Sequence, residues 1–267
     1  MNSGKIVLLT LLFVLLTIPL GAQMSICSVA TLKGTYGGHA EGTVLAQFPG
    51  FPPPPYPAVA AGLHSYDGAG NVSVTYGSSL GGVIIPWGVV ATGTYTVTPD
   101  CKVSVALTDP MGSYHFVGMI MGQGMQQEVH LMYTDPFWVL SGMFRRTPRR
   151  GCSQASLRGK YLLFGQGLAS IPNLPPLLPA AHVGIMTADG QGNLSGNDTL
   201  NIAGTVAPDT FTGTYTVNLD CTYSATITTG VGVLQEAGTI TGEDQQQEIH
   251  TIFMESGWVV AESAQKQ

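Results

Sequence analysis

The chain has 267 residues and a net charge of −6; only 10% of its residues are charged, and 35 are glycine. Soluble domains usually carry about 25% charged residues, so this Gly- and Thr-rich composition is typical of an exported β protein with a hydroxyl-rich surface. The acidic balance argues against nucleic acid as a partner, because phosphate binding requires a basic face.

The N-terminus has the features of a secretory signal peptide. One lysine in MNSGK precedes the apolar run Ile6–Leu20, and Gly21–Ala22 supplies small residues at which a signal peptidase can cut. A transmembrane anchor is the alternative, but Pro19 and the short run argue against it, since a span needs about 20 apolar residues. We therefore expect residues 1–22 to be removed near Ala22, no membrane span afterwards, and a secreted or periplasmic protein.

The rest of the chain is a tandem repeat. With an offset of 120, Gly93–Arg146 and Gly213–Lys266 share 19 of 54 residues, including GTYTV, an Asp-Cys pair, QQE-x-H and Trp-Val. A search for such internal repeats identifies duplicated architectures directly.

The match extends upstream into the first part of each copy. The pattern Cys-Ser-x-Ala-x-Leu-x-Gly-x-Tyr begins at Cys27 and again at Cys152, and DGAGN has its counterpart in DGQGN. The sequence therefore predicts two domains, 27–146 and 152–264, joined by the linker 147–151.

Each copy consists of short alternating segments separated by turn signals. Thr94–Thr98 alternates Thr with Tyr and Val, the pattern of a half-buried strand, and DGxGN is typical of a tight hairpin turn. The strands expected in the first copy are 33–47, 58–66, 70–78, 87–98, 101–108, 113–121, 126–134 and 137–145. Eight antiparallel strands favour a closed meander barrel. The predicted fold is thus all-β, two tandem barrels of about eight strands each, with two β-sandwiches as the alternative.

The four cysteines occupy corresponding places in the two copies. Three pairings are available, and in an exported protein the natural ones are Cys27–Cys101 and Cys152–Cys221 within each copy. A zinc site or free thiols are the alternatives, but no CxxC spacing supports a metal site. We predict two disulfides and no metal.

The ordered set of CSxAxLxGxY, DGxGN and GTYTVxxDC motifs resembles a group of uncharacterised exported bacterial β proteins, over nearly all of the chain after residue 22. The implied barrel is similar, more distantly, to calycin-like barrels such as lipocalins and the allene oxide cyclase and dirigent barrels. The lipocalin Gly-x-Trp motif is absent near Gly34–Tyr36 and Gly159–Tyr161. The resemblance implies a fold and no activity.

Two groups of repeated side chains are candidates for function. Glu128 and His130, and their counterparts Glu248 and His250, lie two residues apart on a strand and share one face. A pair facing the barrel interior could act as a general base, whereas a pair facing solvent has only a structural role. The second group comprises matched aromatic residues, which are ligand-stacking candidates or core residues: Tyr36, Tyr95, Trp138, Tyr161, Tyr215 and Trp258.

Proline tracts, Phe48–Pro57 and Ile171–Pro179, follow the first strand of each copy and carry apolar side chains. Each is expected to be a flap over a barrel mouth, a docking surface or a rigid connector packed on its own barrel.

Three functions follow as hypotheses. The first is a binding or scaffold module for a small apolar ligand or an envelope component, with no cofactor. The second is an isomerase or cyclase that uses Glu128 and Glu248 inside the barrels. The third, a single outer-membrane barrel of sixteen strands, is disfavoured by the linker and by the paired cysteines. No Gly-x-Ser-x-Gly, HExxH or P-loop motif occurs in the sequence.

Overall fold

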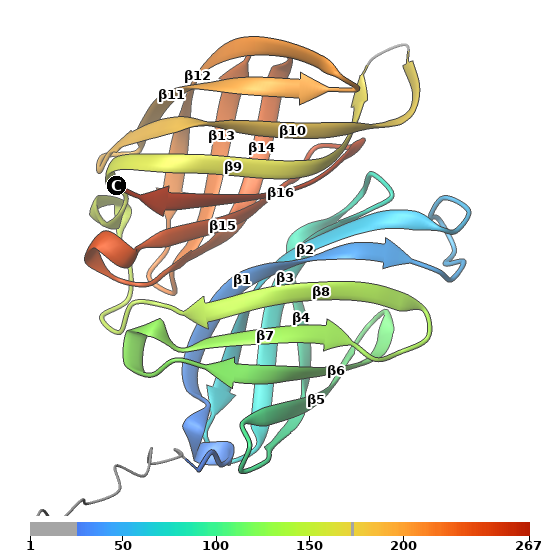
Figure 1. The fold of residues 1–267 in the computed structure, drawn as a ribbon, viewed down its shortest axis with the longest axis vertical. Coiled ribbons are helices and arrows are strands. Elements are labelled where there is room, and N and C mark those ends of the chain that lie inside the picture. The colour runs from blue at the N-terminus through green and yellow to red at the C-terminus, as the bar shows by residue number, and fades with distance from the viewer. Residues whose placement is uncertain (1–25, 172–173) are drawn as a thin grey trace, which may run out of the picture.

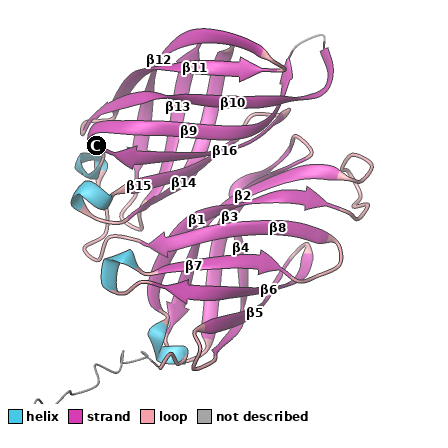
Figure 2. Ribbon diagram, viewed as in Figure 1, coloured by secondary structure: helices cyan, strands magenta, loops and turns pink. Residues whose placement is uncertain are grey.

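The computed structural model describes residues 26–171 and 174–267, which form two closed antiparallel barrels of eight strands each (Figure 1). The all-β prediction and the tandem barrels are confirmed; the strands close as two barrels of eight rather than as two sandwiches or one barrel of sixteen. Helical structure in the described residues is limited to single 3₁₀ turns (Figure 2), and none of these could cross a bilayer. The predicted signal peptide, residues 1–22, lies outside the described residues.

The first barrel follows the order of the sequence around its wall, and β8 pairs with β1 to close it. Its strands are β1 (Lys33–Val44), β2 (Tyr56–Asp67), β3 (Asn71–Leu80), β4 (Val83–Val97), β5 (Lys102–Asp109), β6 (Gly112–Met121), β7 (Glu128–Tyr133) and β8 (Trp138–Arg146).

The second barrel repeats this meander, and β16 pairs with β9 to close it. Its strands are β9 (Arg158–Ile171), β10 (Leu174–Asp189), β11 (Asn193–Ile202), β12 (Thr205–Val217), β13 (Thr222–Thr229), β14 (Gly232–Thr241), β15 (Glu248–Phe253) and β16 (Trp258–Lys266). Short 3₁₀ turns precede β1 (η1, Val29–Thr31), β7 (η2, Gly124–Gln126), β9 (η3, Gln154–Ser156) and β15 (η4, Asp244–Gln246).

The DGxGN motif forms the β2–β3 turn. The carboxylate of Asp67 accepts hydrogen bonds from the backbone N–H of Ala69 at 2.7 Å and of Asn71 at 3.0 Å. Gly68 and Gly70 have φ of 79° and 106°, a region that other residues rarely adopt. Asp189 makes the same bonds to Gln191 and Asn193 in the second barrel.

The repeated GTYTVxxDC phrase ends a strand and fastens it to the start of its copy. The turn closes with a hydrogen bond from Cys101 N to Thr98 O at 2.9 Å, and from Cys221 N to Asn218 O at 3.0 Å. Both cysteines have positive φ, 67° and 69°. The disulfides Cys27–Cys101 and Cys152–Cys221 are present as predicted.

The two barrels pack against each other through the outer faces of their walls. The outer face of β14–β16 covers the outer face of β1 and β2, where Val59 and Ala61 are buried together with Ile252, Val259 and Ala261. Gly37 permits the close approach, because a Cβ there would lie 2.4 Å from the hydroxyl of Thr239. The end of β8 adds a hydrogen bond, from Gly242 N to Arg146 O at 2.9 Å.

Candidate functional site

The repeated QQE-x-H pairs point out of the barrels. On β7, Val129 and Leu131 are in the core. Glu128 and His130 alternate with them and therefore face outward, 3.2 Å apart on a partly exposed surface. On β15, Glu248 and His250 lie 3.4 Å apart at the contact between the barrels, where the imidazole of His250 is buried 5.5 Å from that of His39. None of these four side chains lines a barrel interior, so their geometry is that of a surface and an interface.

Arg145 and His250 set the electrostatics of this contact. Burial alone would raise the pKa of Glu248, but the neighbouring His250 and Arg145 outweigh it and lower that pKa. Burial lowers the pKa of His39 to about 3, and His250 adds to the shift. The contact thus holds one neutral imidazole and an ion pair between the barrels.

Four of the six candidate aromatic residues make hydrogen bonds within their own barrel, near the end at which β1 and β9 begin. The hydroxyl of Tyr36 donates to the side-chain oxygen of Gln127, and that of Tyr161 donates to Gln247 at 2.6 Å. The hydroxyls of Tyr95 and Tyr215 donate to the carbonyl oxygens of Leu32 and Leu157, each at 2.7 Å, just past η1 and η3. Because these four hydroxyls already have hydrogen-bond partners within the barrel, the four tyrosines have a structural role.

The remaining two candidates, Trp138 and Trp258, line cavities near the opposite end of each barrel. In the first barrel, part of the proline tract packs beside this end. Phe48 stacks on Trp138 with ring centroids 5.4 Å apart, and Phe51 stacks on Tyr56 at 6.3 Å. The packing of this tract on its own barrel agrees with a rigid connector. In the second tract, residues 172–173 lie outside the described residues.

The cavity of the first barrel is small and aromatic. It has a volume of about 70 Å³, roughly half of the 150 Å³ that holds benzene in an engineered apolar cavity. His64 is part of its wall; its ring lies 3.9 Å from that of Phe144, and burial lowers its pKa to about 3. Toward the mouth, Asp109 accepts hydrogen bonds from the hydroxyls of Tyr76 and Tyr114. The described residues that line this interior therefore present a largely aromatic surface, with no lysine or arginine among them.

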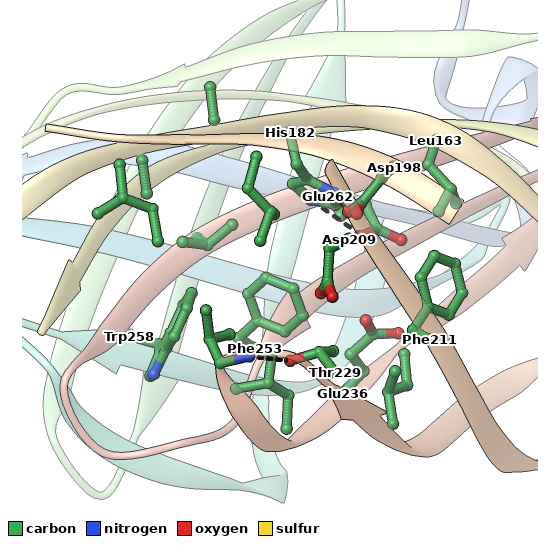
Figure 3. A pocket seen from close by; sticks show the side chains of 18 of the residues that line it. Leu163, His182, Asp198, Asp209, Phe211, Thr229, Glu236, Phe253, Trp258 and Glu262 are labelled. Atoms are coloured by element: carbon green, nitrogen blue, oxygen red, sulfur yellow. Dashed lines mark hydrogen bonds and ion pairs between the residues drawn. The ribbon is translucent and has the colours of Figure 1, made fainter. Parts of the chain in front are cut away.

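The cavity of the second barrel, of about 50 Å³, is built differently, because it contains a histidine held between two acids (Figure 3). His182 on β10 has its Nδ1 3.1 Å from Asp198 on β11 and its Nε2 3.2 Å from Glu262 on β16. All three side chains are at least nine-tenths buried. Gly165 on β9 provides the room, since a Cβ there would lie 2.0 Å from Nε2 of His182.

The pKa values of two groups in this cavity are raised, which keeps one group charged and the other neutral. Burial alone would lower the pKa of His182, but the hydrogen bond to Asp198, the ion pair with Glu262 and the charges of both acids raise it to about 10. Glu236 on β14 lies in the same cavity, and burial together with the charge of Glu262 raises its pKa well above the usual range. At neutral pH the cavity thus combines an imidazolium with a protonated carboxyl group, the pattern of perturbed groups that marks candidate functional sites.

Two further acidic features give the cavity an excess of negative charge. Oδ1 of Asp198 is buried and has no hydrogen-bond partner among the described residues. Asp209 on β12 lines the cavity near its mouth and accepts the backbone N–H of Gly230 at 3.0 Å. Two carboxylates against one imidazolium leave one negative charge, and Asp209 adds another. The remaining wall is largely apolar: Leu163, Met186, Leu200, Phe211, Ile227, Leu234, Phe253, Trp258 and Val260.

This cluster was missed in the sequence because only residues shared by both copies were considered. By strand register, His182 corresponds to Ala60 and Asp198 to Tyr76, while Glu236 and Glu262 correspond to Phe116 and Gly142. The sequence did contain a usable signal: ionisable residues at positions whose strand pattern predicts an inward side chain, in the second copy and not in the first. In an almost uncharged chain, such residues are unexpected in a core.

No cluster of three or more His, Cys, Asp or Glu side chains in the described part of the chain is arranged to hold a metal ion. Both ring nitrogens of His182 already face carboxylates, so it is not a free ligand. No protein-family model matches the chain, and no curated protein sequence matches it.

Proposed function

We propose that the protein is a binding protein that holds a small ligand inside its second barrel, and that this ligand joins a positively charged group to a compact apolar body. The observation that carries the proposal is the buried, unpartnered Oδ1 of Asp198 in a cavity with excess negative charge. An unsatisfied buried acceptor is costly, and a donor carried by a cationic ligand would satisfy it with a charge-assisted hydrogen bond.

The apolar wall supports the second half of the proposal. Small-molecule sites combine largely apolar linings with a few placed polar groups, and the cavity has this composition. Its size of about 50 Å³ is a third of the 150 Å³ that holds benzene, so even a short-chain ligand enters only if side chains at the mouth move. For the aromatic cavity of the first barrel, the small apolar ligand predicted from the sequence remains our proposal, and an envelope component stays a prediction.

Calorimetric titration with three probes of one shape tests the proposal: butylammonium, 1-butanol and butyrate. We expect butylammonium to bind, 1-butanol to bind at least about tenfold more weakly, a difference of about 1.4 kcal/mol, and butyrate not to bind. Asp198→Asn should weaken butylammonium by a similar factor, whereas Asp135→Asn, a surface acid of the first barrel paired with His115, should leave it unchanged. Equal affinity for butylammonium and 1-butanol would contradict a cation site.

A second candidate is an isomerase or cyclase whose site is this cavity, and one observation favours it. Glu236 is held protonated, whereas Asp198 and Glu262 in the same cavity face the imidazolium of His182. The cavity therefore contains both a proton donor and proton acceptors. In an enolisation, Glu236 gives its proton to a carbonyl oxygen while Asp198 or Glu262 removes the α-proton. The acids proposed from the sequence, Glu128 and Glu248, face away from the interior and do not enter this candidate.

Deuterium exchange into butanone, followed by NMR in D₂O, tests this candidate. Faster exchange with the wild-type protein than with Glu236→Gln supports it. If exchange proceeds at the rate in buffer alone with both proteins, the isomerase or cyclase candidate is contradicted and only the binding function remains.

The two disulfides are consistent with an extracellular or periplasmic location, where such bonds persist. We propose that residues 1–22 direct export and are removed near Ala22. N-terminal sequencing of the exported protein tests the cleavage point, and retention of Met1 would contradict it.

A further inference from the structure

The contact between the two barrels joins two different faces of one repeated unit. The second barrel contributes the outer face of β14–β16, and the first barrel contributes the outer face of β1 and β2. Because the units are copies, the first barrel also has a β14–β16 equivalent, and the second barrel has a β1–β2 equivalent. Within the chain only the margins of these equivalents meet the other barrel: Arg145 on β8 pairs with Glu248, and Gln166 on β9 and Leu177 on β10 reach the first barrel. The rest of each equivalent lies outside the contact, so each chain has one largely free face of each kind.

The free face on the first barrel is the outer surface of β6–β8, called here the β6–β8 face and consisting of Met119, Met121, Met132 and Val139. The repeat offset of 120 aligns Met132 with Ile252 and Val139 with Val259. In the second barrel those two residues are buried, with exposed fractions of 0% and 1%. Met132 and Val139 are instead 55% and 60% exposed, although they are equally apolar.

The free face on the second barrel is the outer surface of β9 and β10, called here the β9–β10 face and consisting of Leu162, Phe164, Val183 and Ile185. The strand register aligns Val183 with Ala61 and Leu162 with Gly37, two residues at the contact between the barrels. Ala61 is 1% exposed, whereas Val183 is 58% exposed and Phe164 55%.

These two faces hold a disproportionate share of the exposed apolar surface. Of the seventeen large apolar side chains that are exposed in the described residues, eight belong to the two faces. Scattered exposed apolar residues are ordinary, but apolar patches mark interaction sites. The patches here coincide with the two surfaces that the duplication predicts to be mutually complementary.

We infer that the chain associates with further copies of itself head to tail, the β6–β8 face of one copy docking on the β9–β10 face of the next. The contact between barrels within one chain is the template. Leu162 stands where that contact has Gly37, and Met119 where it has Thr239, so the second contact is made by larger apolar side chains instead of a close backbone approach.

Since the two faces differ, the association is heterologous. Each added copy leaves one face of each kind free, so the assembly closes as a ring or continues as a filament. The driving force is burial of apolar surface, about 25 cal/mol per Å² removed from water. Association is therefore expected to persist in high salt, unlike a contact made of charges.

Sedimentation velocity on the purified protein over a concentration series tests the inference, with one substitution on each face. Wild type is expected to form species larger than a dimer as concentration rises. Met132→Arg and Val183→Arg should each be monomeric alone, yet an equimolar mixture should form a 1:1 dimer, because the mixture retains one intact face of each kind. Val206→Arg, which replaces a valine 63% exposed on β12, should associate as wild type does.

Three outcomes overturn the inference. Wild type that stays monomeric up to its solubility limit removes the association. A single variant that keeps the wild-type behaviour points to a symmetric contact of like faces. A mixture that stays monomeric, with both variants folded by circular dichroism, shows that the faces do not pair; the pair Met119→Arg and Phe164→Arg repeats the test at independent positions.

Discussion

Arg145 of the first barrel forms an ion pair with Glu248 of the second, with 3.0 Å between Nη1 and Oε1. Its Nε lies 3.5 Å from Glu128 of its own barrel, and the side chain is buried. One guanidinium therefore faces the carboxylates of both QQE-x-H copies. The motif whose repetition suggested a paired site helps to hold the two barrels together.

Replacement of Arg145 by Gln should weaken the contact between the barrels. The change leaves Glu128 and Glu248 without their shared cation, and removing one partner of a buried, charge-assisted contact costs about 2 kcal/mol. We expect a lower midpoint of thermal unfolding by calorimetry, with the two barrels unfolding less cooperatively. Arg150→Gln, which removes an exposed guanidinium from the linker, is the matched control and should leave the midpoint unchanged. An equal midpoint for Arg145→Gln and wild type would show that the ion pair adds nothing.

The sequence was sufficient to predict the fold, because the period of two and the turn chemistry agree along the whole chain. All eight strands expected in the first copy are present, with ends displaced by a few residues. The largest displacement is at β4, which was expected to begin at residue 87 and begins at Val83. Strand ends depend on pairing with neighbours, and this information is absent from a local pattern.

The candidate site could not be predicted in the same way, for two physical reasons. Period two separates the two faces of a strand but does not say which faces inward, and Glu128 lies on the outer one. The apolar partners Val129 and Leu131 decided the orientation. In addition, Glu262 reaches His182 only because β9 pairs with both β10 and β16, a closure that no short motif encodes.

The imidazolium of His182 should make stability fall as pH rises. Its pKa is raised from 6.5 to about 10 in the folded state, so the stabilisation is fully present below pH 6.5 and is lost as pH rises toward 10. We expect the free energy of unfolding in urea to decline across this window, and His182→Gln to flatten the decline. His115→Gln, at an exposed histidine paired with Asp135, should keep the wild-type profile. A profile for His182→Gln that parallels the wild type would refute the charged state.

Glu236 should reduce the stability of the protein at neutral pH. Its pKa is raised well above the usual range by burial and by Glu262. The unfolded chain therefore releases a proton near pH 4.5 that the folded chain keeps, and stability falls as pH rises above that value. Glu236→Gln keeps the shape without the proton, so we expect it to stabilise the protein by about 2 kcal/mol at pH 7 and by much less at pH 4. A variant less stable than wild type at pH 7 would indicate that Glu236 is ionised.

His64 should produce the opposite dependence on pH, because it is buried without an acid. Burial lowers its pKa to about 3, so the unfolded chain takes up a proton below pH 6.5 that the folded chain refuses. Stability is then present above pH 6.5 and is lost as pH falls toward 3, by about 1.4 kcal/mol per pH unit in that range. His39, whose pKa is also lowered to about 3, contributes with the same sign.

Urea unfolding of His64→Phe between pH 6.5 and 4 measures this contribution. Phenylalanine suits the position, since the ring of His64 already packs against Phe144 and Phe116. Within the described residues its one side-chain hydrogen bond is to the hydroxyl of Tyr66 at 3.3 Å. We expect the acid-side slope to fall by about 1.4 kcal/mol per pH unit, with the remaining dependence on pH set by His39 and by the opposite contribution of Glu236. An unchanged slope would mean that the first barrel admits a proton to His64. In that case its aromatic cavity is accessible to water, and an apolar ligand would have to displace that water in order to bind.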